Sequence, residues 1–162
     1  MTLPTPEGER PLTAPRADVT LHGARLLVES VTAAARAAGR AVTVAVVDTA
    51  GVLVAFERMD GAPRFSADLA ASKARTAMTF GRPTSAMEAT FADRPAFTSS
   101  FVLQGDWYLG RGGFPVRVDD AVVGGIGVSG DDAEREEDLA RAAAELLSGR
   151  RPGGPAPDST PR

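Results

Sequence analysis

A single lysine is the first residue whose type and setting suggest chemistry. Lys73 is the only lysine among 18 basic residues, the rest being arginines. On a helix, Leu69, Thr76 and Phe80 would share its face. An amine beside apolar neighbours can act as an acid or base, bind an anion, or pair with a carboxylate. The alternative is a surface lysine whose alkyl chain packs on apolar groups while its amine stays in water.

Asp60 is a second candidate for proton transfer. It follows Arg58 at the end of a predicted strand and precedes a turn that contains Gly61 and Pro63. Such turns often present functional groups. We therefore predict Lys73 or Asp60 as the acid or base of a catalytic site and Arg58 as a ligand-binding residue. The alternative for Arg58 and Asp60 is a structural ion pair.

Two short elements combine glycine with arginine, GRPT at residues 81–84 and GRGGFP at residues 110–115. Backbone N–H groups freed by glycines, next to an arginine, can hold a carboxylate or a phosphate. The spacing matches neither the dinucleotide-binding pattern nor the phosphate-binding loop of nucleotide hydrolases. Turn formation is the alternative role for most of these glycines.

His22 is the only histidine, and it lies in the first turn of a predicted helix. The positive end of a helix favours the neutral imidazole, which can bind iron, so His22 is a candidate metal ligand. The alternative is an ordinary surface histidine. One histidine and no cysteine argue against a zinc site and against a Ser-His-Asp triad. Other conceivable axial ligands are Met59, Met78, Met87 and Tyr108.

The overall composition narrows the class of protein. The 162 residues contain no cysteine and carry a formal net charge of −3, which excludes a disulfide-built scaffold and gives no reason to expect nucleic acid as a partner. No apolar run approaches the roughly 20 residues that span a bilayer, and the first residues lack a secretory signal pattern. We expect a cytoplasmic protein without a membrane partner.

The elements that must position these residues form one predicted domain, 18–149, between proline-rich segments 1–17 and 150–162 that we expect to be disordered. Two pairs of strand-like runs predict hairpins and hence an antiparallel sheet. The run 42–48 lacks polar alternation, which predicts helices on both faces of the sheet and an α/β (α+β) fold. The predicted order is a helix after Thr20, strands 42–48 and 52–59, helices 66–80 and 84–91, an irregular loop 92–113, strands 114–118 and 121–128, and a helix from Asp131.

Five motifs follow one another in a recognisable order: ERMDGAP, SKARTA, FGRPT, GGFPV and VVGGIGVSG. With them the chain resembles, over about residues 19–147, the GlcG/HbpS-like family of haem-binding or haem-degrading domains. The same domain forms the C-terminal part of PduO-type corrinoid adenosyltransferases. The resemblance implies a three-layer α/β/α, profilin-like fold with an antiparallel sheet of about five strands, and assembly into dimers or higher homo-oligomers.

The resemblance also implies that the motif residues cluster in one pocket. The loop between residues 96 and 111 holds the only tryptophan and the only tyrosine, which suggests a pocket mouth adapted to a planar or ring-shaped ligand. No iron ligand of the family carries over to His22. The predicted ligand-binding residues are Arg58, Thr76, Arg82, Thr84, Trp107, Tyr108, Arg111, Gly112, Gly113 and Pro115.

Three functions follow as hypotheses. The first is a small-ligand-binding protein that holds haem, or a related tetrapyrrole, at a pocket associated with the oligomer. The second is a cofactor-independent isomerase, lyase or hydrolase of a small anionic metabolite, in which Arg82 or Arg111 binds a carboxylate and Lys73 or Asp60 moves a proton. The third is a non-catalytic accessory protein whose alanine-rich and glycine-rich faces serve assembly.

Overall fold

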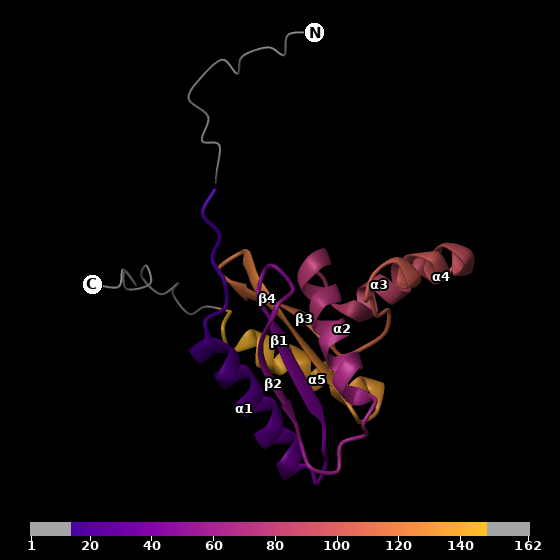
Figure 1. Ribbon diagram of the computed structural model, residues 1–162. Helices are drawn as coiled ribbons and strands as arrows, with labels where there is room; N and C mark the ends of the chain where they lie inside the picture. The colour runs from indigo at the N-terminus through magenta and orange to yellow at the C-terminus, as the bar shows by residue number, and fades with distance from the viewer. Residues whose placement is uncertain (1–13, 149–162) are drawn as a thin grey trace, which may run out of the picture.

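The computed structural model describes residues 14–148, which contain five helices and four strands (Figure 1). Residues 1–13 and 149–162, which include most of both predicted tails, lie outside the described range, and residues 14–20 form no helix or strand. The order is α1 (Leu21–Ala37), β1 (Thr43–Val47), β2 (Leu53–Arg58), α2 (Ser66–Phe80), α3 (Thr84–Phe91), α4 (Pro95–Gln104), β3 (Gly113–Val118), β4 (Ala121–Ser129) and α5 (Ala133–Glu145).

The strands form one antiparallel sheet in the order β2-β1-β4-β3. The two predicted hairpins are therefore confirmed, and β1 and β4 form the centre. The sheet has four strands, so the expectation of about five was wrong by one. Before α1, Val19 donates its N–H to the Val123 carbonyl at 2.8 Å, and the segment adds no strand beyond this contact.

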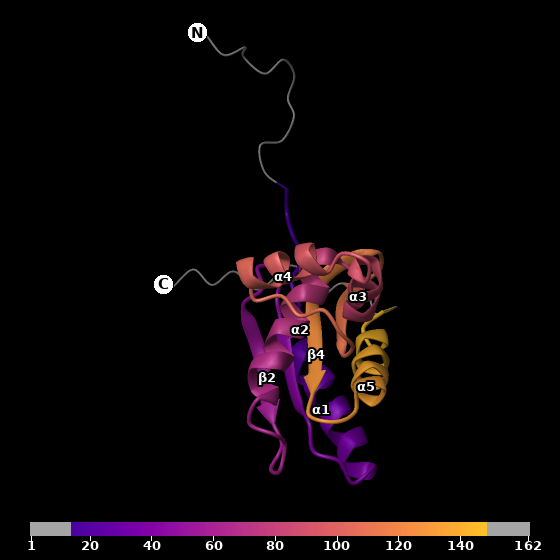
Figure 2. The same ribbon diagram turned by 90° about the vertical axis from the view of Figure 1, so that its right-hand side faces the viewer.

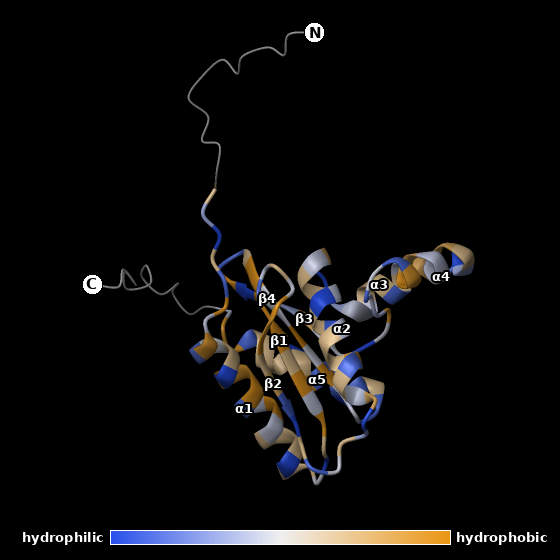
Figure 3. Cartoon of the chain, in the orientation of Figure 1, coloured by the Kyte–Doolittle hydropathy of each residue, from blue (hydrophilic) through white to orange (hydrophobic). Residues whose placement is uncertain are grey.

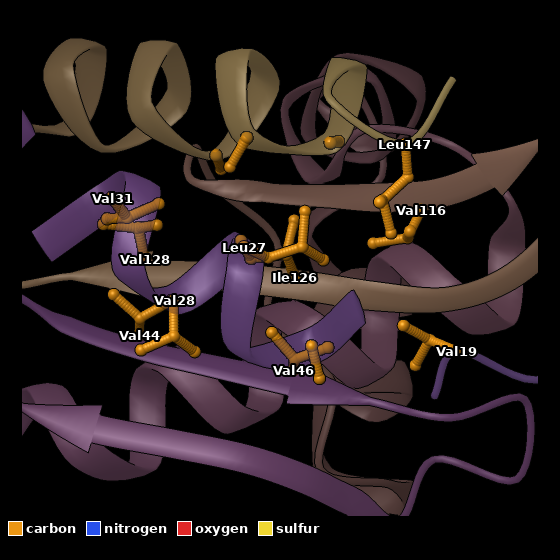
Figure 4. Close-up of a cluster of buried hydrophobic side chains, with 14 of the residues drawn as sticks. Val19, Leu27, Val28, Val31, Val44, Val46, Val116, Ile126, Val128 and Leu147 are labelled. Carbon is orange, nitrogen blue, oxygen red and sulfur yellow. The ribbon is translucent and has the colours of Figure 1, made fainter. Parts of the chain in front are cut away.

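Helices cover both faces of the sheet, which confirms the three-layer α/β/α architecture. Helix α2 packs on β4, β1 and β3 from one side, whereas α1 and α5 pack from the other (Figure 1). The larger core lies between α1, α5 and the sheet, where Leu27, Val44 and Ile126 are fully buried (Figure 4). β1 is coloured mainly as hydrophobic in Figure 3, as its two-sided burial requires.

The opposite face is packed more closely because β4 carries glycines there. A Cβ built on Gly127 would lie 2.0 Å from the Ala70 carbonyl oxygen, and one on Gly125 would lie 2.2 Å from that of Ala74. Any side chain at these two positions would push α2 off the sheet. The glycines thus bring the backbone of α2 onto β4, and with it the side of the helix that carries Lys73.

The segment 92–113 contains a helix, so the prediction of an irregular loop was wrong for part of it. Helix α4 begins with Pro95 at its first turn and contains no charged residue and no buried one. Its apolar residues lack helical periodicity, which is why sequence reasoning missed it. Figure 2 shows α3 and α4 across one end of the sheet, beyond the C-terminal end of α2.

Two local predictions hold. The Thr20 hydroxyl caps α1 by accepting the Gly23 N–H at 3.1 Å. In the turn between β3 and β4, Asp119 takes a left-handed conformation with φ of 51°, a region that aspartate tolerates better than most residues.

Within residues 14–148, no helix combines the length and apolar character needed to cross a membrane.

Candidate functional site

Lys73 is buried in an ion pair rather than exposed. Its Nζ donates to Oε2 of Glu136 at 2.6 Å and to the Val128 carbonyl at 3.0 Å, and the lysine side chain is 1% exposed. Lys73 belongs to α2 and Glu136 to α5, which lie on opposite faces of the sheet. The pair therefore joins the two outer layers beside the start of β3.

Glycine leaves the room for this pair. Gly112 has φ of 102°, and a Cβ there would lie 2.7 Å from the Val128 carbonyl oxygen and 3.1 Å from Nζ of Lys73. The other oxygen of Glu136 accepts the N–H groups of Gly130 at 2.7 Å and Asp131 at 3.2 Å. The carboxylate thus has a partner for each oxygen, as a buried charge requires.

Burial has an electrostatic cost that Glu136 offsets in part. Desolvation lowers the pKa of Lys73 below its ordinary value, while the hydrogen bond and charge of Glu136 act in the opposite direction. Tyr108 lies next to the pair, with its ring centroid 4.9 Å from Nζ of Lys73. Its own burial, followed by the charges of Glu136 and Glu88, raises the pKa of the Tyr108 hydroxyl.

Thr76 and Thr84 hold the backbone around the pair. The buried Thr76 hydroxyl donates to the Ser72 carbonyl at 2.8 Å and accepts the Tyr108 N–H at 2.9 Å. The buried Thr84 hydroxyl accepts the Gly113 N–H at 3.0 Å. Both predicted ligand-binding threonines therefore hold the loop that leads into β3.

Pro115 and Gly113 stand at the outer edge of the sheet. The Val128 N–H donates to the Gly112 carbonyl, so Gly112 faces β4. Because successive residues of an antiparallel strand alternate in direction, the backbone groups of Gly113 and Pro115 face away from β4. Gly113 gives its N–H to Thr84, and proline has none. This edge consequently offers no free donor at either position.

The predicted charged residues lie apart from Lys73. Asp60 is exposed in the turn after β2, and Arg58 beside it donates to the Ala62 carbonyl at 3.2 Å. Arg111 is half-exposed and 3.5 Å from a carboxylate oxygen of Glu137. Within residues 14–148, the exposed side chains of Arg82 and Asp60 have neither a hydrogen bond nor an ion pair. The carboxylate that meets Lys73 is thus Glu136, not Asp60.

Sequence reasoning missed Glu136. It is one of six acids between residues 131 and 138, which we attributed to the positive end of the last helix. Nothing in its spacing sets Glu136 apart from its neighbours. The available signal was Lys73 itself, because a lysine among apolar neighbours requires a counter-charge when buried.

Trp107 belongs to an aromatic cluster that attaches α4 to the domain. The cluster consists of Phe80, Phe91, Phe97, Phe101 and Trp107. The rings of Phe101 and Trp107 stack with centroids 6.0 Å apart and planes 17° apart, and Phe97 stacks on Phe101 at 5.8 Å and 19°. Phe97 is 39% exposed and the neighbouring Leu103 86%, so one side of the cluster and of α4 faces solvent.

His22 is exposed in the first turn of α1, on the sheet face opposite α2. It does not meet Lys73 or the aromatic cluster within one chain. Among the other conceivable iron ligands, Met87 is buried, Met59 packs against the core, and the raised pKa of Tyr108 disfavours the phenolate that binds iron. No group of three metal-ligating side chains occurs in the described part of the chain.

Two surface cavities lie away from the predicted site. One of about 500 Å³ opens between residues 15–17, the end of α2 and the start of β4, and includes Met78 in its wall. The other, of about 390 Å³, lies between α1 and β2. Neither is lined by Lys73 or Trp107, so the predicted pocket mouth coincides with neither cavity.

Comparison with known proteins decides the family. A family model described as haem degrading protein HbpS-like matches residues 19–145. This chain belongs to the HbpS-like family. The family's fold and the resemblance noted from the motifs are thereby confirmed.

Individual proteins that are similar to this chain include one curated sequence and two solved structures. A 15.0 kDa protein from the dhaT-dhaS intergenic region of Citrobacter freundii is 32% identical over 135 residues, which cover 82% of this chain and 94% of that protein. The crystal structure of a double mutant of Streptomyces reticuli HbpS is 33% identical, with a TM-score of 0.78 over 91% of this chain and 100% of HbpS. The crystal structure of a PduOC–haem complex is 26% identical, with a TM-score of 0.73 over 81% of this chain and 96% of PduOC.

Proposed function

We propose that this protein binds haem or a related tetrapyrrole as a homo-oligomer. The observation that carries the proposal is the PduOC–haem complex, whose fold this chain shares over 81% of its length, together with membership in the HbpS-like family. Because the two sequences are 26% identical, the residues that hold the ligand must be argued from this chain itself.

The aromatic cluster fits the ring of a tetrapyrrole. Trp107 and Phe101 stack on each other with planes 17° apart, and the partly exposed faces that they turn away from this stack are suited to a flat apolar ligand by stacking and by burial of apolar area. The exposed guanidinium of Arg82, just beyond the C-terminal end of α2, is available to the carboxylates that haem carries. We place the ring against Trp107 and the carboxylates near Arg82.

The iron atom fits this surface less well. The only histidine lies on the opposite sheet face of the same chain, so His22 can reach a ring at Trp107 only from a second copy. An open aromatic surface also leaves one side of the ring in water unless another chain covers it. Both points favour a ligand held between subunits.

The enzyme hypothesis for Lys73 finds less support. The amine is 1% exposed, is held by Glu136 and Val128, and lines neither cavity. A proton-transfer role requires contact with substrate, which this arrangement does not offer. We therefore assign Lys73 a positioning role for the loop that carries Trp107 and Tyr108.

Haemin titration tests the proposal. We expect a saturable shift of the Soret band with one haemin per site, and about tenfold weaker binding in Trp107→Ala because a stacking partner is lost. Phe65→Ala, at a 65% exposed aromatic residue outside the cluster, is the matched control and should bind normally. Nonsaturating absorbance in the wild type would overturn the proposal.

Iron-free protoporphyrin IX separates ring binding from iron ligation. His22→Ala should change the haemin spectrum while the affinity for protoporphyrin IX stays the same. An unchanged haemin spectrum would remove His22 as the ligand and leave the stacking site intact.

A further inference from the structure

The outer side of β2 is an open sheet edge. Met59 donates its N–H to the Val42 carbonyl at 3.0 Å, which fixes the alternation of the ladder with β1. Glu57 and Ala55 therefore point their backbone groups toward β1, whereas Phe56 and Arg58 point theirs outward. Within the described residues, no side chain occupies these outward groups. Unpaired N–H and C=O groups of this kind are a template for another strand.

The side chains of β2 reinforce this exposure. Phe56 pairs with Ala45, which packs against α2, so the Phe56 side chain is on the α2 side of the sheet. Helix α2 covers β1, β4 and β3, and Phe56 remains 46% exposed. Leu53 on the same strand is 43% exposed. Exposed apolar side chains next to an open sheet edge are typical of a surface that another chain covers.

A second copy of the same chain is the occupant that the sheet favours. An open edge can pair with the partner's β2 or with its β3, but Thr84 and Pro115 leave the β3 edge without a donor at its first two outward positions. Pairing of β2 with β3 is a head-to-tail contact that builds a ring or an open filament, whereas antiparallel pairing of β2 with β2 forms a closed two-fold dimer and uses both open edges.

Charge selects the register. The groove between α1 and β2 is lined by Arg25 and Glu29 from the helix and by Ala55 and Glu57 from the strand. A register with Phe56 at the two-fold axis places Glu57 opposite the uncharged Ala55 of the second copy. The next register along the strand would instead place the two Glu57 carboxylates opposite each other, which is destabilising.

We propose that the edge of β2 is the dimer interface of this protein, with Phe56 of two copies meeting at the two-fold axis of a continuous eight-stranded sheet. The interface specifies the self-association in the proposed function and makes no use of haem. A protein that dimerises through β2 without binding haemin would overturn the proposed function alone. One that binds haemin as a monomer would overturn the interface and the homo-oligomer in the proposed function, and would leave haem binding itself standing.

Light scattering coupled to size-exclusion chromatography gives the first test. We expect the wild type at twice its chain mass of 16.8 kDa, or a multiple of that dimer. Phe56→Lys should be monomeric, or half the wild-type mass, with an unchanged circular dichroism spectrum. Leu103→Lys on α4, which is 86% exposed, should keep the wild-type mass. A monomeric wild type, or a Phe56→Lys variant of wild-type mass, would overturn the proposal.

Crosslinking gives a second test that does not depend on how Phe56→Lys folds. The chain contains no cysteine, so a single introduced thiol is unique. Phe56→Cys should form a covalent dimer with a short bis-maleimide at micromolar protein, because two strands paired at this residue bring the thiols within reach. Leu103→Cys should stay monomeric on a denaturing gel. Equal crosslinking of both variants, or none at Phe56→Cys, contradicts the interface.

Discussion

The two edge strands of the sheet are built in opposite ways. At β3, Thr84 takes the outward N–H of Gly113, Pro115 has none to offer, and the buried Lys73–Glu136 pair lies behind the start of the strand. At β2, the outward backbone groups and the side chain of Phe56 are open. One edge is thus closed within the chain, and the other is available to a partner.

This difference gives several motif residues a structural role. Thr84, Gly113 and Pro115 come from the segments FGRPT and GGFPV, which carried the family resemblance and were predicted to bind ligand. Their contacts in this structure close an edge and hold the loop beside Lys73. The candidate ligand surface lies instead on the aromatic cluster.

Removing the charge of Glu136 should have the largest effect. Glu136→Gln leaves the Lys73 ammonium buried without its counter-charge, and we expect a loss of about 3–5 kcal/mol in the free energy of unfolding. Urea denaturation measures this. Glu137→Gln, at a neighbouring carboxylate that is 3.5 Å from the half-exposed Arg111, should cost under about 1 kcal/mol. Similar losses in both variants would remove the special role of the buried pair.

Removing the hydrogen bond at the start of β3 should lower the free energy of unfolding by less than Glu136→Gln does. Thr84→Val keeps the shape of the side chain but leaves the buried Gly113 N–H without an acceptor, for an expected loss of about 1–3 kcal/mol. Thermal and urea unfolding measure the change. Thr90→Val on the exposed part of α3 is the control, with an expected change within about 0.5 kcal/mol. A loss no larger than that of the control would contradict the contact.

The buried Lys73–Glu136 pair should also make the free energy of unfolding depend on pH. Because folding lowers the pKa of Lys73, the unfolded chain binds more protons above that lowered value, and stability should rise with pH up to about 10. Above pH 10 the raised pKa of Tyr108 acts in reverse, since the unfolded tyrosine loses its proton first. Urea denaturation at several pH values, compared with Lys73→Met/Glu136→Leu, isolates the lysine contribution. An equal slope below pH 10 in the double variant would disprove it.

The smallest change in stability is expected at Pro115. Pro115→Ala restores an outward N–H at the β3 edge and should alter the free energy of unfolding by less than about 1 kcal/mol. Association should nevertheless increase with concentration beyond the wild-type mass, because a second edge becomes available. Sedimentation velocity measures it, and Pro95→Ala on α4 is the control. A variant with wild-type association would show that Pro115 does not protect this edge.

Much of the fold was predictable because its signals are local. The residues of β1 have no polar alternation, and their burial on both faces confirms the prediction of a central strand. Helix α4 escaped prediction because its apolar residues are spread around the helix and form no amphipathic face, although Phe97 and Phe101 are four residues apart. Its stability comes from ring contacts with α2 and α3, which become visible only in three dimensions.

The candidate site was predicted in part. Lys73 was singled out correctly as unusual, but its partner Glu136 is 63 residues away and is one carboxylate among several at the start of a helix. Asp60, chosen for its place beside a turn, is exposed and does not contact Lys73. Distance along the chain carried no information about which acid the lysine would meet.

By itself, the sequence determined the helices other than α4, the two hairpins and the family, because periodicity, turn residues and ordered motifs are properties of neighbouring residues. The tertiary structure decided which carboxylate neutralises Lys73, which sheet edge is closed and where the aromatic rings gather. These outcomes depend on how closely α2 approaches β4, which Gly125 and Gly127 permit. That approach brings Lys73 to α5 and Thr84 to β3, and no local pattern specifies contacts between layers.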